Sequence, residues 1–525
     1  MPESPTLAPP ARSPATHGTG RAAAPQPLVH KTVLSALGNL AVVGGTAVVA
    51  VVTARVLGPE GMGSLGYLTW LVAMSAVVLQ LGLPASLQRY LAELHGQGRR
   101  EQAEVLAHAC LRTALRAGAG GAALLLAAAW AIPGLGVPGS LAPLVALLLP
   151  LQVLVETARG LWSGQQDFAR LARRNLAGSV ILALGVSLGA LTGGVGGALV
   201  GHLAAAAATL GLGPLRLALR PARAALPPEL RARLRAFARD TWLAAIVSAL
   251  VWTRVEVAFL QHAWGETSVG LFTAGLSLAA FVTQFPVLLC GPLLPHLAER
   301  VALRDRAGMQ RAYACATRVL GFLLLPMCLG AAAVMPVLLP LLFGAGFAPG
   351  VATAQLLVLT AAPGAIAAAG SALLYAHERS GWIFRFGLLG ALLAIGGCAA
   401  LVPALATEGA ALARALAQST MLAIGIGLVT RGLGFTLPWR SLGRSLVAGL
   451  ACAGAAAGIL ALLPGCAGLA VAIVAGGLVH VLASRVLGAL EGDDLQALDQ
   501  ALRYVPAPLR GLARGLLCGA GGAGR

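Results

Sequence analysis

Long apolar runs alternate with short polar connections along almost the whole chain. A helix that crosses a bilayer needs about 20 mostly apolar residues, and fourteen runs of this kind can be placed. The pattern therefore predicts an all-α polytopic membrane protein of about 14 transmembrane helices. The predicted spans cover residues 33–54, 65–85, 113–132, 141–162, 176–193, 195–215, 241–262, 269–291, 319–342, 351–375, 382–402, 409–430, 445–463 and 467–488.

The composition agrees with this pattern. Of the 525 residues, 58% are hydrophobic and 11% are charged, whereas soluble proteins carry roughly 25% charged residues. The 68 glycines and the low aromatic content suit helices that pack closely within lipid. A soluble fold is excluded, but the net charge of +18 leaves a nucleic-acid partner open until the charges are placed.

The positive charges lie in the connections between the predicted spans. If the chain starts in the cytoplasm, every Lys and Arg except Arg55, Arg254 and Arg414 falls on the cytoplasmic side. The opposite orientation would contradict the positive-inside rule. We therefore expect both termini in the cytoplasm, and we attribute the excess charge to topology rather than to a nucleic-acid partner.

The connections on the opposite side are too short to form a catalytic domain. Leu57–Ser64, Pro133–Ser140 and Ala263–Ser268 contain few polar groups. A membrane glycan polymerase would be expected to expose a larger loop with catalytic Arg, His or carboxylate groups. The eight cysteines form no CxxC pair, which indicates neither a metal site nor a disulfide framework. We expect no enzymatic activity, no catalytic residue and no metal site.

Two segments repeat each other at an interval of about six spans. LQRYLAELHGQGRREQAEVLAHACLRTAL (Leu87–Leu115) and PHLAERVALRDRAGMQRAYACATRVL (Pro295–Leu320) both contain Leu-Ala-Glu, then a basic turn and then a Cys. Because six is an even number of spans, the copies share one orientation and form parallel repeats. Two such lobes can rock against each other and expose a central cavity to each side in turn, as transporters do.

The repeat divides the chain into two lobes with flanking segments. Spans 1–6 form the N-lobe and spans 7–12 the C-lobe, while spans 13 and 14 lie outside the repeat. The first 30 residues are rich in Pro, Ala, Ser and Thr and lack the apolar region of a signal peptide. The predicted parts are a disordered cytoplasmic tail (1–32), the N-lobe (33–215), a basic cytoplasmic linker (216–240), the C-lobe (241–430), spans 13–14 (445–488) and a cytoplasmic tail (489–525).

Five segments stand out by their order and spacing along the chain. They are ARVLGPEGMGSLGYLTWL (Ala54–Leu71), LGLPASLQRYLAE (Leu81–Glu93), TRVEVAFLQHAWGETSVGLFTAGLSL (Thr253–Leu278), LLFGAGFAPG (Leu341–Gly350) and EGAALARALA (Glu408–Ala417). Together they resemble the polysaccharide transporter family, which comprises the lipid-linked oligosaccharide flippases of the multidrug/oligosaccharidyl-lipid/polysaccharide exporter superfamily. The resemblance extends over residues 33–490. Where the family commonly has Arg-x-Asp, this chain has Arg254 and Glu256.

The resemblance implies a flippase of the bacterial inner membrane. Its substrate would be an undecaprenyl-diphosphate-linked oligosaccharide, the repeat unit of an O-antigen, exopolysaccharide or capsule, moved across the membrane by alternating access. The implied partners are this lipid-linked substrate, the lipid bilayer and a polysaccharide polymerase or export machinery. No cofactor is expected, although H+ or Na+ could couple to transport.

Three alternatives stay open at this stage. A drug/cation antiporter of the same superfamily needs a titrating carboxylate in the first lobe, where Glu156 is the candidate. A glycan polymerase is disfavoured by the short outer connections. A lipid II flippase usually lines its first lobe with several basic residues, whereas the first span here has Asn39 but no Arg.

Charged residues inside predicted spans are the first candidates for the substrate path, because a charge at mid-membrane costs about 2.5–3.5 kcal/mol. Arg254 could bind the substrate diphosphate through bidentate hydrogen bonds or form an ion pair between the lobes. In an unbroken helix, Glu256 would point to nearly the opposite face. Arg414 and Gln418 form a second polar stripe, although Arg414 could instead reach the outer headgroups or pair with Glu408.

Uncharged polar groups complete the hypothetical path. They could line a sugar-sized cavity or simply hold helices together, and the candidates are Asn39, Gln80, Gln355 and Trp252, with Gln284 and His202. Glu156 and Arg159 share a face of the fourth span and are interpreted as a structural ion pair. Arg55 is interpreted as an anchor at the outer membrane surface.

Overall fold

The computed structural model describes residues 28–220, 226–252, 254–290, 293–377, 379–492 and 494. Within these ranges the side chains of residues 28–43, 133, 251–252, 284–290, 295, 365, 380 and 383 are left undescribed. All regular structure in these ranges is helical, and no strand occurs in them. Among the described residues, ten helices are long and apolar enough to cross a membrane. The prediction of an all-α polytopic membrane protein is confirmed. The parts of the predicted tails at 1–27 and 495–525 lie outside the described residues.

The helices follow one another along the chain with short connections. They are α1 (Leu28–Leu79), α2 (Leu83–Gly96), α3 (Arg100–Ala131), α4 (Ala142–Gly164), α5 (Phe168–Leu210), α6 (Leu212–Leu219), α7 (Pro228–Trp252), α8 (Glu256–Cys290), α9 (Leu293–Ala302), α10 (Arg306–Phe343), α11 (Val351–Ala376), α12 (Ser380–Gly427), α13 (Trp439–Leu462) and α14 (Cys466–Leu487). Short 3-10 turns cover Pro133–Leu135 and Ala345–Gly350, and a π-helical turn covers Leu428–Gly432.

Four of the long helices each carry parts of two predicted spans. α1, α5 and α8 change direction at glycines with positive φ, namely Gly58, Gly194 and Gly265, whereas α12 turns at Ala406 with φ 47°. Within α5 and α12 the two halves fold back on each other, so that Gly189 lies against Gly197 in α5. The fourteen predicted runs are thus accommodated in the ten apolar helices and in α7, which carries the first part of the seventh run.

The backbone repeats itself as the sequence predicted. Gly58 (φ 68°, ψ −174°) and Gly265 (φ 75°, ψ −170°) make the same turn in equivalent places. The basic turns after α2 and α9 also match, because Gly98 (φ 73°) and Arg304 (φ 55°) both adopt the left-handed conformation. Arginine accepts this conformation less readily than glycine. Both copies therefore keep one turn geometry despite different residues.

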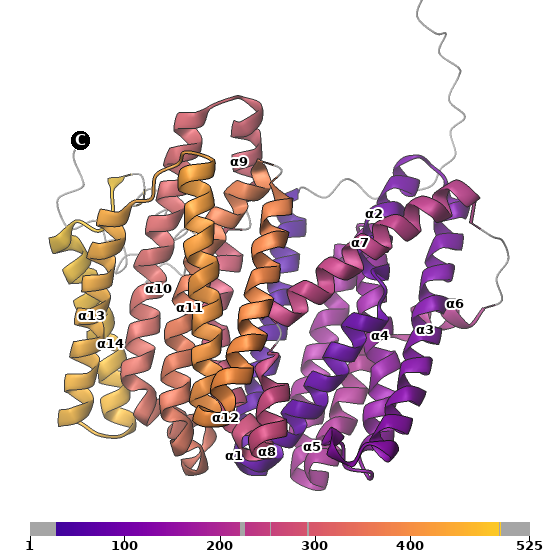
Figure 1. Cartoon of the computed structure of the whole chain (residues 1–525), viewed down its shortest axis with the longest axis horizontal. Coiled ribbons are helices and arrows are strands. Elements are labelled where there is room, and N and C mark those ends of the chain that lie inside the picture. Colours follow the sequence, from indigo (N-terminus) through magenta and orange to yellow (C-terminus); the bar gives the residue numbers. More distant parts are fainter. Residues whose placement is uncertain are drawn as a thin grey trace, which may run out of the picture.

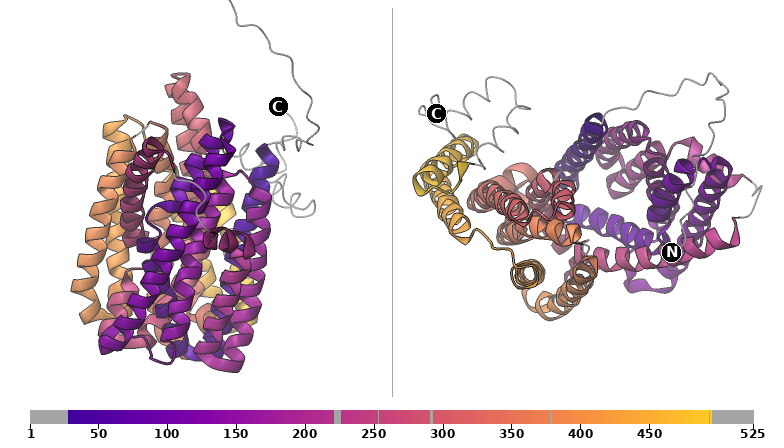
Figure 2. Two further views of the ribbon diagram at one scale, coloured as in Figure 1. Left: turned by 90° about the vertical axis from the view of Figure 1, so that its right-hand side faces the viewer. Right: turned by 90° about the horizontal axis from the view of Figure 1, so that it is seen from above.

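The two lobes lie side by side, with α13 and α14 packed on the outer edge of the C-lobe against α10 (Figures 1 and 2). The first residue of α1 and the last residue of α14 lie at the same end of the bundle (Figure 1). We call this end the terminal face. The membrane-spanning length of the helices separates it from the opposite face, where α1 and α8 turn.

α7 crosses obliquely from the N-lobe to the C-lobe (Figure 1). It contacts the N-lobe along its first half and its middle, where Arg233 forms an ion pair with Glu93 at 3.1 Å and Trp242 donates to the Val78 carbonyl at 2.8 Å. Residues 228–240 of the predicted linker are the helical beginning of α7. The connection between the lobes is therefore held on the N-lobe by side-chain contacts.

At the opposite face the lobes meet through two glycines in equivalent positions. Gly63 of α1 lies against the backbone of Glu266, and Gly270 of α8 lies against the backbone of Pro59. Arg55 of α1 also donates from Nε to the Leu342 carbonyl at the end of α10, at 2.8 Å. The N-lobe and the C-lobe are thus in close backbone contact at this face, and Arg55 binds protein carbonyls there.

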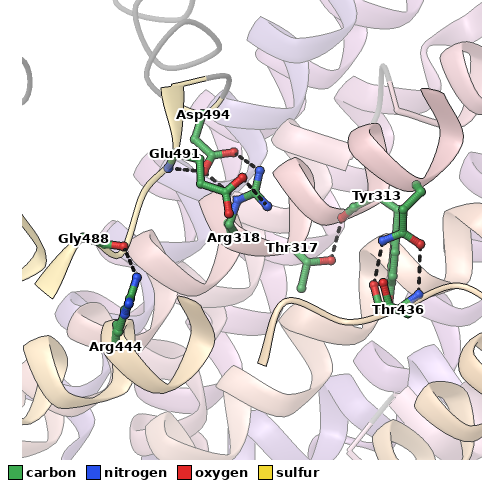
Figure 3. A network of polar contacts seen from close by, with 9 residues as sticks. Tyr313, Thr317, Arg318, Thr436, Arg444, Gly488, Glu491 and Asp494 are labelled. Carbon is green, nitrogen blue, oxygen red and sulfur yellow. Dashed lines mark hydrogen bonds and ion pairs between the residues drawn. The ribbon is translucent and has the colours of Figure 1, made fainter. Parts of the chain in front are cut away.

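A polar network fixes the end of the described chain to the C-lobe at the terminal face (Figure 3). Asp494 is fully buried and accepts two hydrogen bonds from the Arg318 guanidinium of α10, at 2.6 and 2.9 Å. Glu491 pairs with the same arginine at 3.1 Å, and Arg444 of α13 donates to the Gly488 carbonyl. The segment after α14 is therefore tied to both α10 and α13.

Replacing Asp494 with Ala is expected to lower the free energy of unfolding by about 2 kcal/mol, because a charge-assisted hydrogen bond contributes about 1.5–3 kcal/mol. Glu491 remains to balance Arg318, which keeps the loss below that of a fully unpaired buried charge. Thermal unfolding of the purified protein in detergent measures the effect. The matched variant Asp240→Ala removes an exposed carboxylate that pairs with its neighbour Arg239 and should leave the melting curve unchanged; equal melting curves for both variants would contradict the prediction.

Candidate substrate site

The seventh predicted span is interrupted in the middle of the bundle. α7 ends at Trp252 and α8 begins at Glu256, and Arg254 between them has φ 52°. The expectation that Arg254 and Glu256 occupy opposite faces of one continuous helix is therefore wrong. The N–H groups of Val257 and Ala258 in the first turn of α8 donate to the Arg254 and Val255 carbonyls just before the helix, and the N-terminus of the helix carries partial positive charge. Broken helices of this kind form binding sites in membrane transporters.

Glu256 forms a buried ion pair across the C-lobe with Arg414 of α12. Nε of Arg414 lies 2.9 Å from Oε1 of Glu256, and Nη2 donates to Oε2 at 3.3 Å. The two side chains are only 9% and 3% exposed. The alternatives for Arg414, contact with outer headgroups or with Glu408, are therefore wrong. The ion pair joins α8 to α12 beside the helix break.

Arg254 lies close to this ion pair. Its guanidinium is within electrostatic range of both Arg414 and Glu256, and no ion pair or hydrogen bond to its side chain is found within the described part of the chain. Two arginines therefore lie near one carboxylate that pairs only with Arg414, which leaves one positive charge in excess. A second negative charge would balance the group, and the α8 N-terminus adds to the attraction for it.

The other predicted path residues are dispersed. Gln418 lies one turn beyond Arg414 on α12, and its buried Oε1 has no partner among the described residues. Gln355 donates to the Ala332 carbonyl at 2.9 Å and joins α11 to α10. Gln80 lies in the turn after α1, where it is partly buried. The side chains of Asn39, Trp252 and Gln284 lie outside the described residues.

Cavities lie in both lobes. One of about 250 Å³ lies inside the N-lobe between α1, α4 and α5, and one of about 440 Å³ lies inside the C-lobe between α10, α11 and α12. A third, of about 640 Å³, lies between α8, α10, α13 and α14 and is lined almost entirely by apolar side chains. The C-lobe cavity includes Gln418 and the N-lobe cavity includes His202.

The N-lobe cavity contains polar groups that the sequence reasoning only partly identified. Arg159 and Glu156 form the predicted ion pair, with Nη1 and Oε1 2.6 Å apart. Asn175 also lines the cavity but was not singled out. A signal was present, because Asn175 and Ser179 are one helical turn apart within an apolar run and therefore share a face.

Comparisons with known proteins agree with this architecture. Residues 52–352 match the family model described as "Polysaccharide biosynthesis protein". No curated protein sequence matches the chain. Among solved structures, the lipid II flippase MurJ in an inward closed conformation has a TM-score of 0.67 at 12% identity, and the alignment covers 87% of this chain and 98% of that one.

Two further structures are similar in fold. An inward-facing multidrug resistance MATE transporter of the MOP superfamily has a TM-score of 0.60 at 17% identity and covers 76% of this chain and 94% of its own. A MOP superfamily transporter from Pyrococcus furiosus has a TM-score of 0.53 at 16% identity and covers 77% of this chain and 94% of its own. At these identities the likeness establishes a shared fold.

Proposed function

Because this chain belongs to the polysaccharide biosynthesis protein family, which its match over residues 52–352 establishes, we propose that it is a flippase for an undecaprenyl-diphosphate-linked oligosaccharide. The cargo would be an O-antigen, exopolysaccharide or capsule repeat unit. It would cross the inner membrane of a bacterium from the inner to the outer leaflet by alternating access.

The excess positive charge at the helix break is the observation that carries this proposal. Arg414 pairs with a single carboxylate, Glu256, at the N-terminus of α8, and Arg254 lies within electrostatic range of both. A diphosphate supplies the missing negative charge and can accept bidentate hydrogen bonds from guanidinium groups. A cationic drug would add to the positive charge and would be repelled. The site therefore favours an anionic headgroup.

The apolar cavity between α8, α10, α13 and α14 fits the other half of such a substrate. Leu278, Met327, Val334 and Ile473 are among the side chains that line it. A polyprenyl chain buries favourably against such surfaces, by about 25 cal/mol for each Å² removed from water. A fold that offers both an apolar cavity and a cationic centre suits an amphiphile that carries a diphosphate.

The contacts between the lobes support alternating access. The lobes are in backbone contact at the face opposite the chain ends, through Gly63 and Gly270. By the positive-inside rule, the proposed orientation has the terminal face in the cytoplasm. In this assignment the structure is closed toward the outside, which is the state that would accept cargo from the inner leaflet. Outward release would require the glycine contact to open.

The membrane potential can assist outward movement of the cargo. A potential of 100 mV contributes about 2.3 kcal/mol per elementary charge, and the inside-negative sign favours the exit of a dianionic diphosphate. The sequence contains no P-loop for nucleotide hydrolysis. The proposed driving force is therefore the potential or an ion gradient of H+ or Na+.

Replacing Arg254 with Gln tests the proposal. The variant is expected to lower the flipping rate at least about tenfold, since a hydrogen bond to a charged group contributes about 1.5–3 kcal/mol. The measurement is the transfer of undecaprenyl-diphosphate-linked oligosaccharide across proteoliposomes that contain equal amounts of protein. Arg385→Gln, on the exposed side of α12, is the matched control and should flip at the wild-type rate.

The same chemistry predicts the cellular phenotype. A strain without the protein should accumulate lipid-linked repeat units on the inner leaflet, where they are inaccessible from outside. Unpolymerised units that accumulate outside would instead identify a polymerase. Normal flipping by Arg254→Gln at a normal protein level would remove Arg254 from the substrate site.

A drug/cation antiporter is the weaker candidate. It needs a carboxylate that is free to bind a cation, but Glu156 is already paired with Arg159 at 2.6 Å and Glu256 with Arg414 at 2.9 Å. Uptake of a cationic dye by proteoliposomes, driven by the exit of H+ or Na+ down an imposed gradient, would support this alternative. The proposed flippase is expected to show no such uptake.

A further inference from the structure

The N-lobe cavity is polar although the membrane-spanning helices α1, α4 and α5 enclose it. Gln152 and Arg159 reach it from α4, Asn175 and His202 from the two halves of α5, and Thr69 from α1. A polar group within a membrane is costly unless it is satisfied. A cavity with this lining therefore needs an occupant that can form hydrogen bonds.

Two buried atoms of this cavity lack hydrogen-bond partners among the described residues. They are Nε of Arg159, which is a donor, and Oδ1 of Asn175, which is an acceptor. The Arg159 guanidinium already contacts Glu156 through Nη1. The lining thus offers both an unused donor and an unused acceptor, and the ion pair leaves the arginine charge balanced.

The C-lobe contains the equivalent cavity with a different lining. The turns that end α4 and α11 have the same backbone hydrogen bonds, to the carbonyls of Leu161 and Leu373 respectively. Equivalent positions in the two lobes are therefore 212 residues apart in this region, and this offset aligns the linings of the two cavities. In that register Gln152, Arg159 and Thr209 of the N-lobe correspond to residues 364, 371 and 421, which are Gly, Ser and Met. The polar lining is therefore not imposed by the fold, since the repeated helices form an uncharged and mainly apolar cavity in the C-lobe.

The lining fits a polyhydroxyl compound better than an ion. A cation would meet the Arg159 guanidinium, and an anion would find no excess positive charge because Glu156 already balances Arg159. A hydroxyl group is both donor and acceptor and can satisfy Arg159 and Asn175 at once. The volume of about 250 Å³ is roughly eight times the share of one water molecule in the liquid. The space is large enough for a ring with several hydroxyl groups.

We propose that the N-lobe cavity binds a sugar ring of the lipid-linked substrate. Asn175 and Gln152 hydrogen-bond its hydroxyl groups through their amides, and Arg159 donates from Nε. This inference rests on the proposed flippase function and adds a separate subsite to it. The diphosphate lies at Arg254 and Arg414, while the sugar enters the neighbouring lobe. The preference for glycosylated over bare lipid then comes from the N-lobe.

A binding comparison with two lipids tests the subsite. Purified protein in nanodiscs is titrated with undecaprenyl diphosphate and, separately, with the undecaprenyl-diphosphate-linked oligosaccharide pool extracted from the host strain. The wild type is expected to bind the glycosylated pool about tenfold more tightly than the bare diphosphate, as one or two hydrogen bonds provide. Asn175→Ala and Gln152→Ala should each reduce this ratio several-fold while the bare lipid binds as before.

Ser371→Ala is the matched control, because it removes a polar group at the equivalent C-lobe position, and it should keep the wild-type ratio. Unchanged binding of undecaprenyl diphosphate shows that each N-lobe variant is folded. The subsite proposal would be overturned if the wild type showed no preference for the glycosylated pool. It would also be overturned if the N-lobe variants kept the full preference, or if they lost affinity for both lipids equally. If the wild type bound neither lipid, the flippase proposal itself would fail.

Discussion

Replacing Glu256 alone with Gln is expected to destabilise the protein by about 3–5 kcal/mol, the cost of leaving one partner of a buried ion pair uncompensated. The remaining Arg414 is 8% exposed, and with Arg254 it would leave two positive charges in an apolar part of the C-lobe. The protein can relieve this cost only by admitting water or by displacing α12 from α8. Unfolding in detergent with increasing denaturant measures the loss.

The double variant Glu256→Gln, Arg414→Met separates stability from transport. With both charges of the pair removed, stability should return to within about 1–2 kcal/mol of the wild type, because neutral replacements of buried pairs are tolerated. Transport should remain low, since Arg414 is part of the proposed diphosphate site. A single Glu256→Gln variant as stable as the wild type would show that the pair is hydrated and not buried.

A methyl group at Gly63 is expected to force the lobes apart at the face opposite the chain ends. In Gly63→Ala the new carbon would overlap the Glu266 carbonyl oxygen, and a backbone atom cannot rotate away. Overpacking of this kind costs about 1–3 kcal/mol, which corresponds to a roughly 5- to 150-fold change in the balance between two states. The state closed at this face should lose population, and the flipping rate should fall with it.

Distances between spin labels measure this shift. Labels on cysteines introduced at Ser140 and Thr267, with exposed Cys466 replaced by Ser, report the separation of the two lobes at this face. The control is Gly454→Ala on α13, where a β carbon meets open space, and its distance distribution should match the wild type. A distribution in Gly63→Ala that also matched the wild type would show that the lobes do not rock about this contact.

The candidate site was only partly accessible from the sequence. A charge within an apolar run is a local signal, which is why Arg254, Glu256 and Arg414 could be identified individually. Their arrangement was not local: Glu256 and Arg414 are 158 residues apart, and the favoured reading of Arg414 paired it with Glu408 or the headgroups. The prediction from helical geometry also required a continuous seventh span. The helix instead breaks at Arg254, and the break changes which side chains can contact each other.

The amino-acid sequence by itself determined the helical spans, their turns and the repeat. These features depend on runs of neighbouring residues that must be apolar to lie in the bilayer. They also depend on turns that recur in both halves, such as those at Gly98 and Arg304. Only the tertiary structure decided that Glu256 pairs with Arg414, that Gly63 and Gly270 close one face, and that a polar cavity lies in one lobe. Those contacts join residues far apart in the chain, and one hydrophobic pattern is compatible with many ways of packing the same helices.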